Sequence, residues 1–180
     1  DNILASLTIE SRPENDITNL DALSNLTSIG GDLVIEENSA LINLDGLVNL
    51  TNIPGRLYFS NNDVLTNVDG LGNLTSVGSD LFLYQNSALI NLDGLGKLIS
   101  IGGYLSVSGN NALTNIDGLA SLTSVGSSLG IRFNSALKNL DGLTSIPSLV
   151  SSLSVSSNDA LTNIDGLGNL TDIGSELWIT

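Results

Sequence analysis

The residues of this sequence best suited to bind another molecule are aromatic side chains with a few charged ones near them. A large apolar ring with polar atoms at its edge suits either a protein hot spot or stacking against a sugar ring. The chain has only seven aromatic residues, so their grouping is informative. The candidate ligand-binding residues are Tyr58, Phe82, Tyr84, Tyr104, Arg56, Asp80, Arg132 and Phe133.

Regularly spaced aspartates form a second set that invites a chemical interpretation. They recur every 24 residues, at Asp21, Asp45, Asp69, Asp93, Asp117, Asp141 and Asp165. Carboxylates can attract Ca²⁺, but a calcium site needs about six or more converging oxygens, and one carboxylate per repeat supplies too few. We therefore interpret these aspartates as turn residues that accept hydrogen bonds from the backbone amides just ahead of them. No metal site and no cofactor is predicted.

The composition excludes several classes of function. The chain has no Cys and no His, which excludes thiol chemistry, Cys/His zinc sites and Ser-His catalysis. Only 5 Lys and Arg stand against 19 Asp and Glu, a net charge of −14, so we expect no nucleic acid partner. No run approaches the ~18 apolar residues of a membrane span, so no membrane insertion is expected. No catalytic motif is present, and we predict that the protein is not an enzyme.

A 24-residue repeat organises the whole sequence. Each aspartate usually follows an aliphatic residue and precedes Gly, and a second marker keeps the same step at Asn38, Asn62, Asn86, Asn110, Asn134 and Asn158. Three residues before each of these asparagines ends an L-x-[IVLF] triplet, such as the one ending at Ile35. Leu41, Leu44 and Leu47 then follow at intervals of three, which favours a 3-10-like path over a 3.6-residue helical period. The first repeat departs from the pattern, with two extra residues around Arg12 and Pro13 and with Ala22 in place of Gly.

This period and motif are typical of leucine-rich repeats. Each triplet predicts a short strand with two side chains inward and one outward, and each Asn can satisfy buried backbone groups where the strand ends. The predicted fold is a leucine-rich-repeat solenoid with a parallel β-sheet of about eight short strands on the concave face. Loops and 3-10 turns form the convex face. Residues 1–180 are expected to form one solenoid of about seven repeats, without a second domain.

The run from Leu65 to Leu83, LTNVDGLGNLTSVGSDLFL, resembles the receptor L-domain type of leucine-rich repeat. It is more similar still to tandem repeats of secreted bacterial surface proteins. The resemblance covers the chain from Leu7 to Ile179 and implies a ligand-binding module that is extracellular or at the cell surface. Receptor lobes are usually closed by disulfide-bearing caps, and a chain without Cys favours a bacterial surface protein.

The strand pattern places six of the seven aromatic residues on or beside the outward face of the sheet and leaves Phe59 for the core. Two interpretations stay open. The aromatic residues on three consecutive strands form a binding patch, or β-propensity and cross-strand packing placed them there without a ligand.

The function predicted first is a non-catalytic extracellular binding or adhesion module that recognises a protein or glycan through its concave aromatic face. The alternative is a structural spacer or assembly element of a cell-surface layer or filament, with end-to-end contacts through uncapped edge strands. Because the sequence stops inside a strand, we expect a fragment of a larger protein. Ice binding is a minor alternative, based on the column Thr27, Thr51, Thr75, Thr123 and Thr171, which is broken at Ile99 and Pro147.

Overall fold

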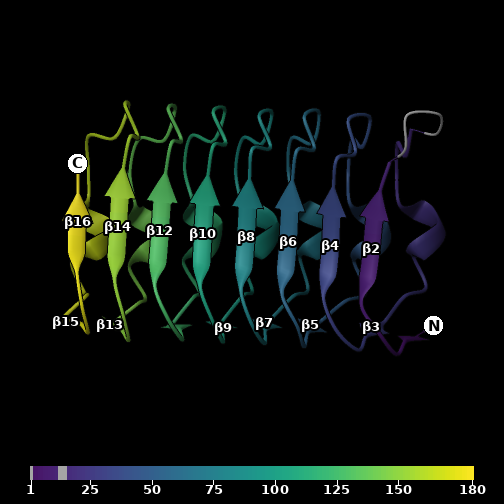
Figure 1. The fold of residues 1–180 in the computed structure, drawn as a ribbon, viewed down its shortest axis with the longest axis horizontal. Helices are drawn as coiled ribbons and strands as arrows, with labels where there is room; N and C mark the ends of the chain where they lie inside the picture. Colours follow the sequence, from purple (N-terminus) through teal and green to yellow (C-terminus); the bar gives the residue numbers. More distant parts are fainter. Residues whose placement is uncertain (1, 12–15) are drawn as a thin grey trace.

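The computed structural model describes residues 2–11 and 16–180, and these form the predicted solenoid (Figure 1). An eight-stranded parallel sheet runs along its length, and its strands follow one another in chain order. The residues with the two-residue insertion, Arg12 and Pro13, lie outside the described part. The strands are β2 (Leu7–Glu10), β4 (Leu33–Glu36), β6 (Leu57–Ser60), β8 (Leu81–Tyr84), β10 (Leu105–Ser108), β12 (Leu129–Arg132), β14 (Leu153–Ser156) and β16 (Leu177–Ile179).

Short 3-10 helices lie behind this sheet in Figure 1, one in each coil. They are η1 (Asp21–Leu23), η2 (Asp45–Leu47), η3 (Asp69–Leu71), η4 (Asp93–Leu95), η5 (Asp117–Leu119), η6 (Asp141–Leu143) and η7 (Asp165–Leu167). The intervals of three in the sequence predicted this path, and the bonds confirm it: the amide of Leu47 donates to the carbonyl of Leu44 at 2.8 Å. In the described part of the chain, no helix has the length and apolar character needed to cross a membrane.

The structure also contains two-residue strands that the sequence did not predict. They pair into narrow parallel sheets along one side of the solenoid, where each coil turns from its 3-10 helix toward the next long strand. They are β1 (Asn2–Ile3), β3 (Ser28–Ile29), β5 (Asn52–Ile53), β7 (Ser76–Val77), β9 (Ser100–Ile101), β11 (Ser124–Val125), β13 (Ser148–Leu149) and β15 (Asp172–Ile173). A strand of two residues is too short to show an alternating pattern, so the sequence did not predict these strands.

The long strands stack in a register of one repeat, so equivalent residues become neighbours. Leu57 pairs with Leu81, and Phe59 pairs with Leu83. Leu57 and Phe59 are completely buried, whereas Tyr58 between them is only half-buried. The predicted alternation is therefore confirmed, and the core consists of columns of leucine and other aliphatic side chains from successive coils with Phe59 as its only aromatic member.

A ladder of buried asparagines satisfies the backbone where each long strand ends. The side-chain oxygen of Asn86 accepts bonds from the backbone amide and the side-chain amide of Asn62, at 3.2 and 3.0 Å. The side-chain nitrogen of Asn86 donates to the carbonyl of Tyr84 at 3.0 Å. It also donates to the side-chain oxygen of Asn110 at 3.4 Å, which continues the ladder into the next coil. In the described residues, every buried side-chain nitrogen and oxygen has a partner. The predicted structural role of this column is confirmed.

The predicted role of the seven aspartates is wrong. Their carboxylates are exposed and accept no hydrogen bond within residues 2–11 and 16–180. The capping acceptor is instead the asparagine two residues earlier: the side-chain oxygen of Asn43 accepts the backbone amide of Asp45 at 3.1 Å. The same bond recurs in the other coils, for example between Asn91 and Asp93 at 3.1 Å. An Asn side chain supplies the acceptor from before the turn, which leaves the aspartate facing solvent.

Close approach of successive coils explains the glycine after each aspartate and the exception at Ala22. A Cβ atom on Gly94 would collide with the backbone carbonyl of Val68 in the preceding coil. The same collision is found at each equivalent glycine from η2 to η7. Ala22 occupies this position in η1, where no described 3-10 helix lies on that side. A coil stacked on η1 at the regular spacing would therefore meet the Ala22 side chain.

Two glycines in one coil should respond oppositely to alanine. We expect Gly94→Ala to lower the free energy of unfolding by about 2–4 kcal/mol, because the coils must separate to accept the new methyl group. Gly96→Ala should raise it by about 0.4–1 kcal/mol, since Gly96 has right-handed helical angles and Ala120 occupies the same place in the next coil. Urea unfolding followed by circular dichroism measures both. Equal effects of the two variants would contradict the steric account.

Candidate functional site

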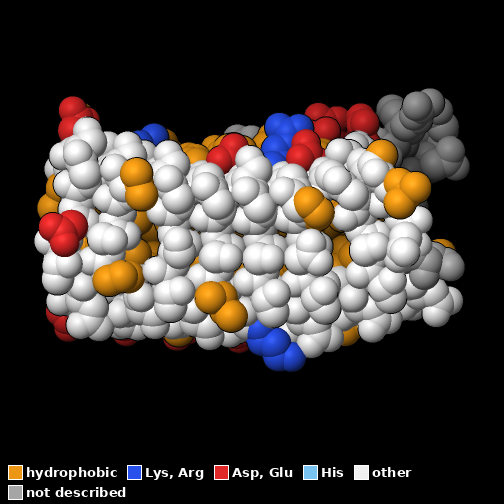
Figure 2. Space-filling model, turned by 90° about the horizontal axis from the view of Figure 1, so that it is seen from below, with side chains coloured by type: hydrophobic (Ala, Val, Ile, Leu, Met, Phe, Trp, Pro, Cys, Tyr) orange, Lys and Arg blue, Asp and Glu red, His pale blue; other side chains and the backbone are white. Residues whose placement is uncertain are grey.

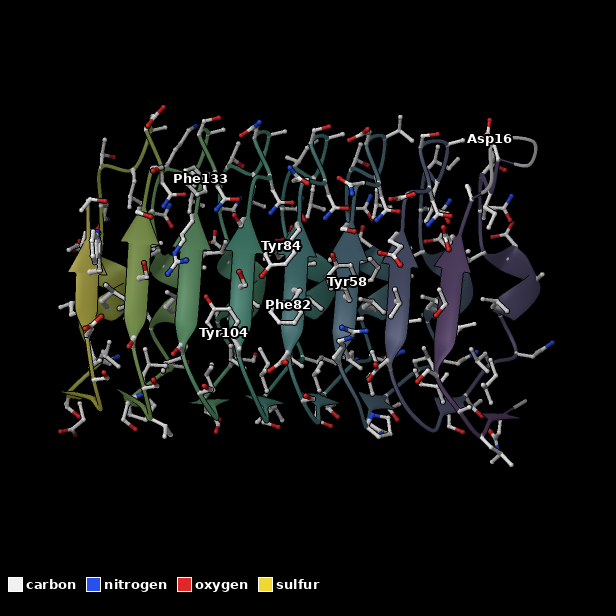
Figure 3. All side chains as sticks on the ribbon, in the orientation of Figure 1. Asp16, Tyr58, Phe82, Tyr84, Tyr104 and Phe133 are labelled. Atoms are coloured by element: carbon white, nitrogen blue, oxygen red, sulfur yellow. The ribbon has the colours of Figure 1, made fainter. Side chains whose placement is uncertain are left out.

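The outer face of the sheet brings together four of the predicted residues, Tyr58, Phe82, Tyr84 and Tyr104, which we call the aromatic patch (Figure 3). Phe82 and Tyr84 stack with ring centroids 5.4 Å apart. Tyr58 meets both of these rings edge-on at 6.0 Å, and Tyr104 lies 5.9 Å from Phe82. All four side chains are half-buried. They form one continuous apolar surface rather than separate exposed rings.

Contacts within the patch also stabilise the sheet. Aromatic pairs at these separations contribute about 0.5–1.5 kcal/mol each beyond the area that they bury. Both interpretations of the sequence therefore have a physical basis: the rings support one another across the strands, and they present a shared surface to solvent.

Arg56 is fixed beside the patch by Asp32, a residue that the sequence analysis did not select. One carboxylate oxygen of Asp32 lies 3.3 Å from the Arg56 Nε, and the other accepts the Arg56 backbone amide at 2.8 Å. The guanidinium carbon lies 5.6 Å from the Tyr58 ring centroid, a cation–π distance. Asp32 lies one repeat before Arg56, at the same position ahead of its strand. This 24-residue spacing is the feature of the sequence that could have indicated their contact.

Asp80 has a different role from the one suggested by its nearness to Arg56 in the sequence. Its carboxylate accepts the backbone amide of Tyr104 at 2.7 Å and so holds the start of β10. Next to it, the Tyr104 ring reaches toward Gly130 on β12, where a Cβ atom would collide with the Tyr104 hydroxyl. Asp80 therefore positions the backbone of Tyr104, and Gly130 leaves room for its ring.

Phe133 lies at the end of β12 and is 58% exposed. Together with Tyr58 and Tyr84 it lines a shallow depression of about 280 Å³, which extends the patch along the carboxyl ends of the strands. Its φ of 55° is in the left-handed region, which a bulky residue adopts only at an energetic cost. The same left-handed angle recurs at Glu37, Asn61, Gln85 and Ser157, so the conformation belongs to the repeat and Phe133 is the bulkiest residue that adopts it.

Two further depressions hollow the sheet face between β10 and β16. One of about 280 Å³ lies between Tyr104 and Trp178, and another of about 420 Å³ shares Trp178 and Arg132 with it. Arg132 donates from Nε to the Ser154 hydroxyl at 3.0 Å. Trp178 was not among the predicted site residues. The signal for it is the outward column itself, in which the small residues Ser106, Gly130 and Ser154 separate Trp178 from the large side chains of the preceding strands.

The side of the solenoid that carries the short strands has few charged side chains at its centre (Figure 2). The threonine column of the ice-binding alternative belongs to this region. The Thr75 hydroxyl donates to the backbone carbonyl of Thr51 at 2.9 Å, and the Thr123 hydroxyl donates to that of Ile99 at 3.2 Å. These protons hold one coil to the next, and Ile99 and Pro147 interrupt the column. Among the described residues, no three Asp or Glu side chains converge as metal ligands.

One family model matches part of the chain. Residues 1–79 match the family model described as Receptor L domain. The predicted receptor L-domain-like character is therefore confirmed over this segment, and the likeness to bacterial surface proteins stays a prediction. No curated protein and no solved structure matches the chain. The matched segment includes Tyr58 and Arg56, whereas the rest of the patch lies beyond it.

Relief of the left-handed conformation at Phe133 should be measurable. We expect Phe133→Asn to raise the free energy of unfolding by about 0.5–1 kcal/mol, because Asn tolerates this conformation and Asn61 occupies the equivalent place. Phe133→Val should lower it, since a β-branched residue fits a positive φ least well. Urea midpoints of the two variants test this pair. Destabilisation by Asn would show that the Phe133 ring makes contacts that outweigh the backbone strain.

Proposed function

We propose that this receptor L-domain-like solenoid is a non-catalytic module that binds a protein through the aromatic patch, at the cell surface or outside the cell. The observation that carries the proposal is the segregation of aromatic side chains onto the solvent-facing side of the sheet, while the core is built from leucine. Clustered aromatic residues beside an Arg are the side chains that most often dominate protein interfaces. The family match supports the proposal, because Receptor L domains bind ligands and are typically extracellular.

Charge on the N-terminal side of the patch favours a partner with a cation next to its apolar contact. Glu10 and Glu36 are adjacent in the sheet register, on the outward side of β2 and β4. Their carboxylates make no hydrogen bond or ion pair within the described residues. A Lys or Arg beside an aromatic or aliphatic side chain of the partner would complement both surfaces at once.

The proposal predicts that the double variant Phe82→Ala/Tyr84→Ala loses ligand binding and keeps its fold. Peptides selected on the wild-type protein from a phage-displayed random library serve as the probe. We expect their affinity to fall by about 30-fold or more on the double variant, the effect of removing a hot spot of about 2 kcal/mol. Neither side chain belongs to the core, so thermal unfolding should remain cooperative.

The matched control is Ile42→Ala, which removes an exposed apolar side chain outside the eight-stranded sheet. Peptide affinity for this variant should equal that for the wild type. A library that yields no specific binder, or binders with equal affinity for the double variant, would contradict the proposed site.

A structural spacer or assembly element is the second candidate, and the uniform strand register along the sheet favours it. A spacer requires regular coils and no unique surface, so many further near-identical repeats in the full-length protein would support it, whereas a single aromatic-rich block supports binding. Ala22 interrupts this regularity, because a coil stacked beside η1 in the regular register would meet its methyl group. The aromatic patch is a unique surface that a spacer does not require, so the binding module is the better-supported function.

A further inference from the structure

We propose that the hollow between Tyr104 and Trp178 is a carbohydrate site that takes pyranose rings of a neutral glycan. It lies on the same outer face of the sheet as the aromatic patch but toward β16, and it does not depend on the proposed protein ligand. The first argument is its shape. Two adjoining depressions, of about 280 and 420 Å³, share Arg132, Ser154 and Trp178, so the site is an open groove long enough for more than one ring.

Aromatic side chains supply the stacking surface of this groove. Trp178 bounds this hollow from β16 and is 60% exposed, on a strand that pairs only with β14 among the described residues. No ring contact joins it to another described aromatic residue, in contrast to the members of the patch. A pyranose with equatorial hydroxyls presents a flat C–H face, and an indole ring with an accessible face is a suitable partner for it. Tyr104 bounds the other side of the same depression.

Serine hydroxyls supply hydrogen-bond donors on the lining of the groove. The Ser128 oxygen accepts the backbone amide of Ser152 at 3.2 Å, and the Ser152 oxygen accepts that of Glu176 at 3.3 Å. The Ser154 oxygen accepts from Arg132. Each oxygen therefore has a fixed position, and none of the three hydroxyl protons has an acceptor among the described residues. These protons can donate to sugar oxygens.

Charged groups at the rim indicate a neutral ligand. Arg132 retains donors beyond the Nε that contacts Ser154, and the exposed Glu176 carboxylate has no partner among the described residues. Together they offer a donor and an acceptor for sugar hydroxyls without a net charge at the site. The protein carries a net charge of −14, which disfavours an anionic glycan. A neutral polyhydroxyl chain matches this combination.

Trp178 is the only Trp in the chain, so its fluorescence reports directly on the groove. The experiment titrates the wild-type protein with cellohexaose and with chitohexaose, and with sorbitol as an open-chain polyol lacking a flat C–H face. We expect a saturable change in emission with at least one hexasaccharide and none with sorbitol. Glucose should bind about tenfold or more weakly than the hexasaccharide, because it occupies only one part of the groove.

Variants locate the binding site by calorimetry. Trp178→Ala should remove hexasaccharide binding, and Trp178→Phe should retain part of it because a stacking ring remains. Glu176→Gln should weaken binding severalfold, whereas Glu37→Gln, a matched change just beyond β4 at a place where the next coil but one carries Gln85, should leave it unchanged. Trp178 and Glu176 are both exposed, so the variants at these two positions should keep the fold.

Absence of a saturable change with both hexasaccharides, up to about 10 mM, would overturn the proposal. Equal affinity of wild type and Trp178→Ala would overturn the placement in this groove. If library peptides, rather than sugars, lost binding on Trp178→Ala, the groove would belong to a protein partner, which would also overturn it. Each result can be separated from the test of the aromatic patch, because that test uses Phe82 and Tyr84 with peptide probes.

Discussion

Hydrogen bonding at the end of each long strand is the constraint on which the rest of the structure depends. The chain turns inward there, into a core where water cannot satisfy its amides and carbonyls. Asn86 and its equivalents provide both a donor and an acceptor to the neighbouring coils, and they are completely buried along most of the stack. An unsatisfied buried polar group costs about 1–3 kcal/mol, so the column is required in every interior coil. At the N-terminal side, the Ser11 hydroxyl donates to Asn38 at 3.1 Å and takes over this role.

Stacking under this constraint determines where a binding surface can form. Residues one repeat apart become neighbours on adjacent strands, so a column of outward side chains acts as a continuous strip. The column containing Tyr58 and Phe82 is large at that end, small at Ser106 and Gly130, and large again at Trp178. A surface with an aromatic ridge next to a hollow follows from this order. The same backbone with Ser at every outward position would present a featureless face.

Residues beside the sheet serve both stability and the candidate sites. Asp32 bonds the next coil through its carboxylate and at the same time holds Arg56 near the Tyr58 ring. Asp80 bonds the backbone of Tyr104 in the same way. Ser128 and Ser152 occupy the same column in later coils. Their hydroxyl oxygens keep the bond to the next coil, and because Ser is smaller than Asp, the unfilled space contributes to the hollow. The choice between Asp and Ser in one structural column therefore changes the chemistry of the outer face.

The sequence by itself determined the fold, the repeat, the inward columns and the outward aromatic column, because a 24-residue period with strand alternation permits one way of burying so many leucines. Tertiary structure decided what periodicity does not contain. Only the three-dimensional structure shows that Asn43, rather than Asp45, supplies the side-chain acceptor at the start of the 3-10 turn, since both residues recur with the same period. Only packing shows that Arg56 pairs with Asp32 and that Gly130 makes room for Tyr104, because side chains of different length reach across strands to unequal distances. The hollow beside Trp178 likewise arises from the volumes that neighbouring coils leave empty.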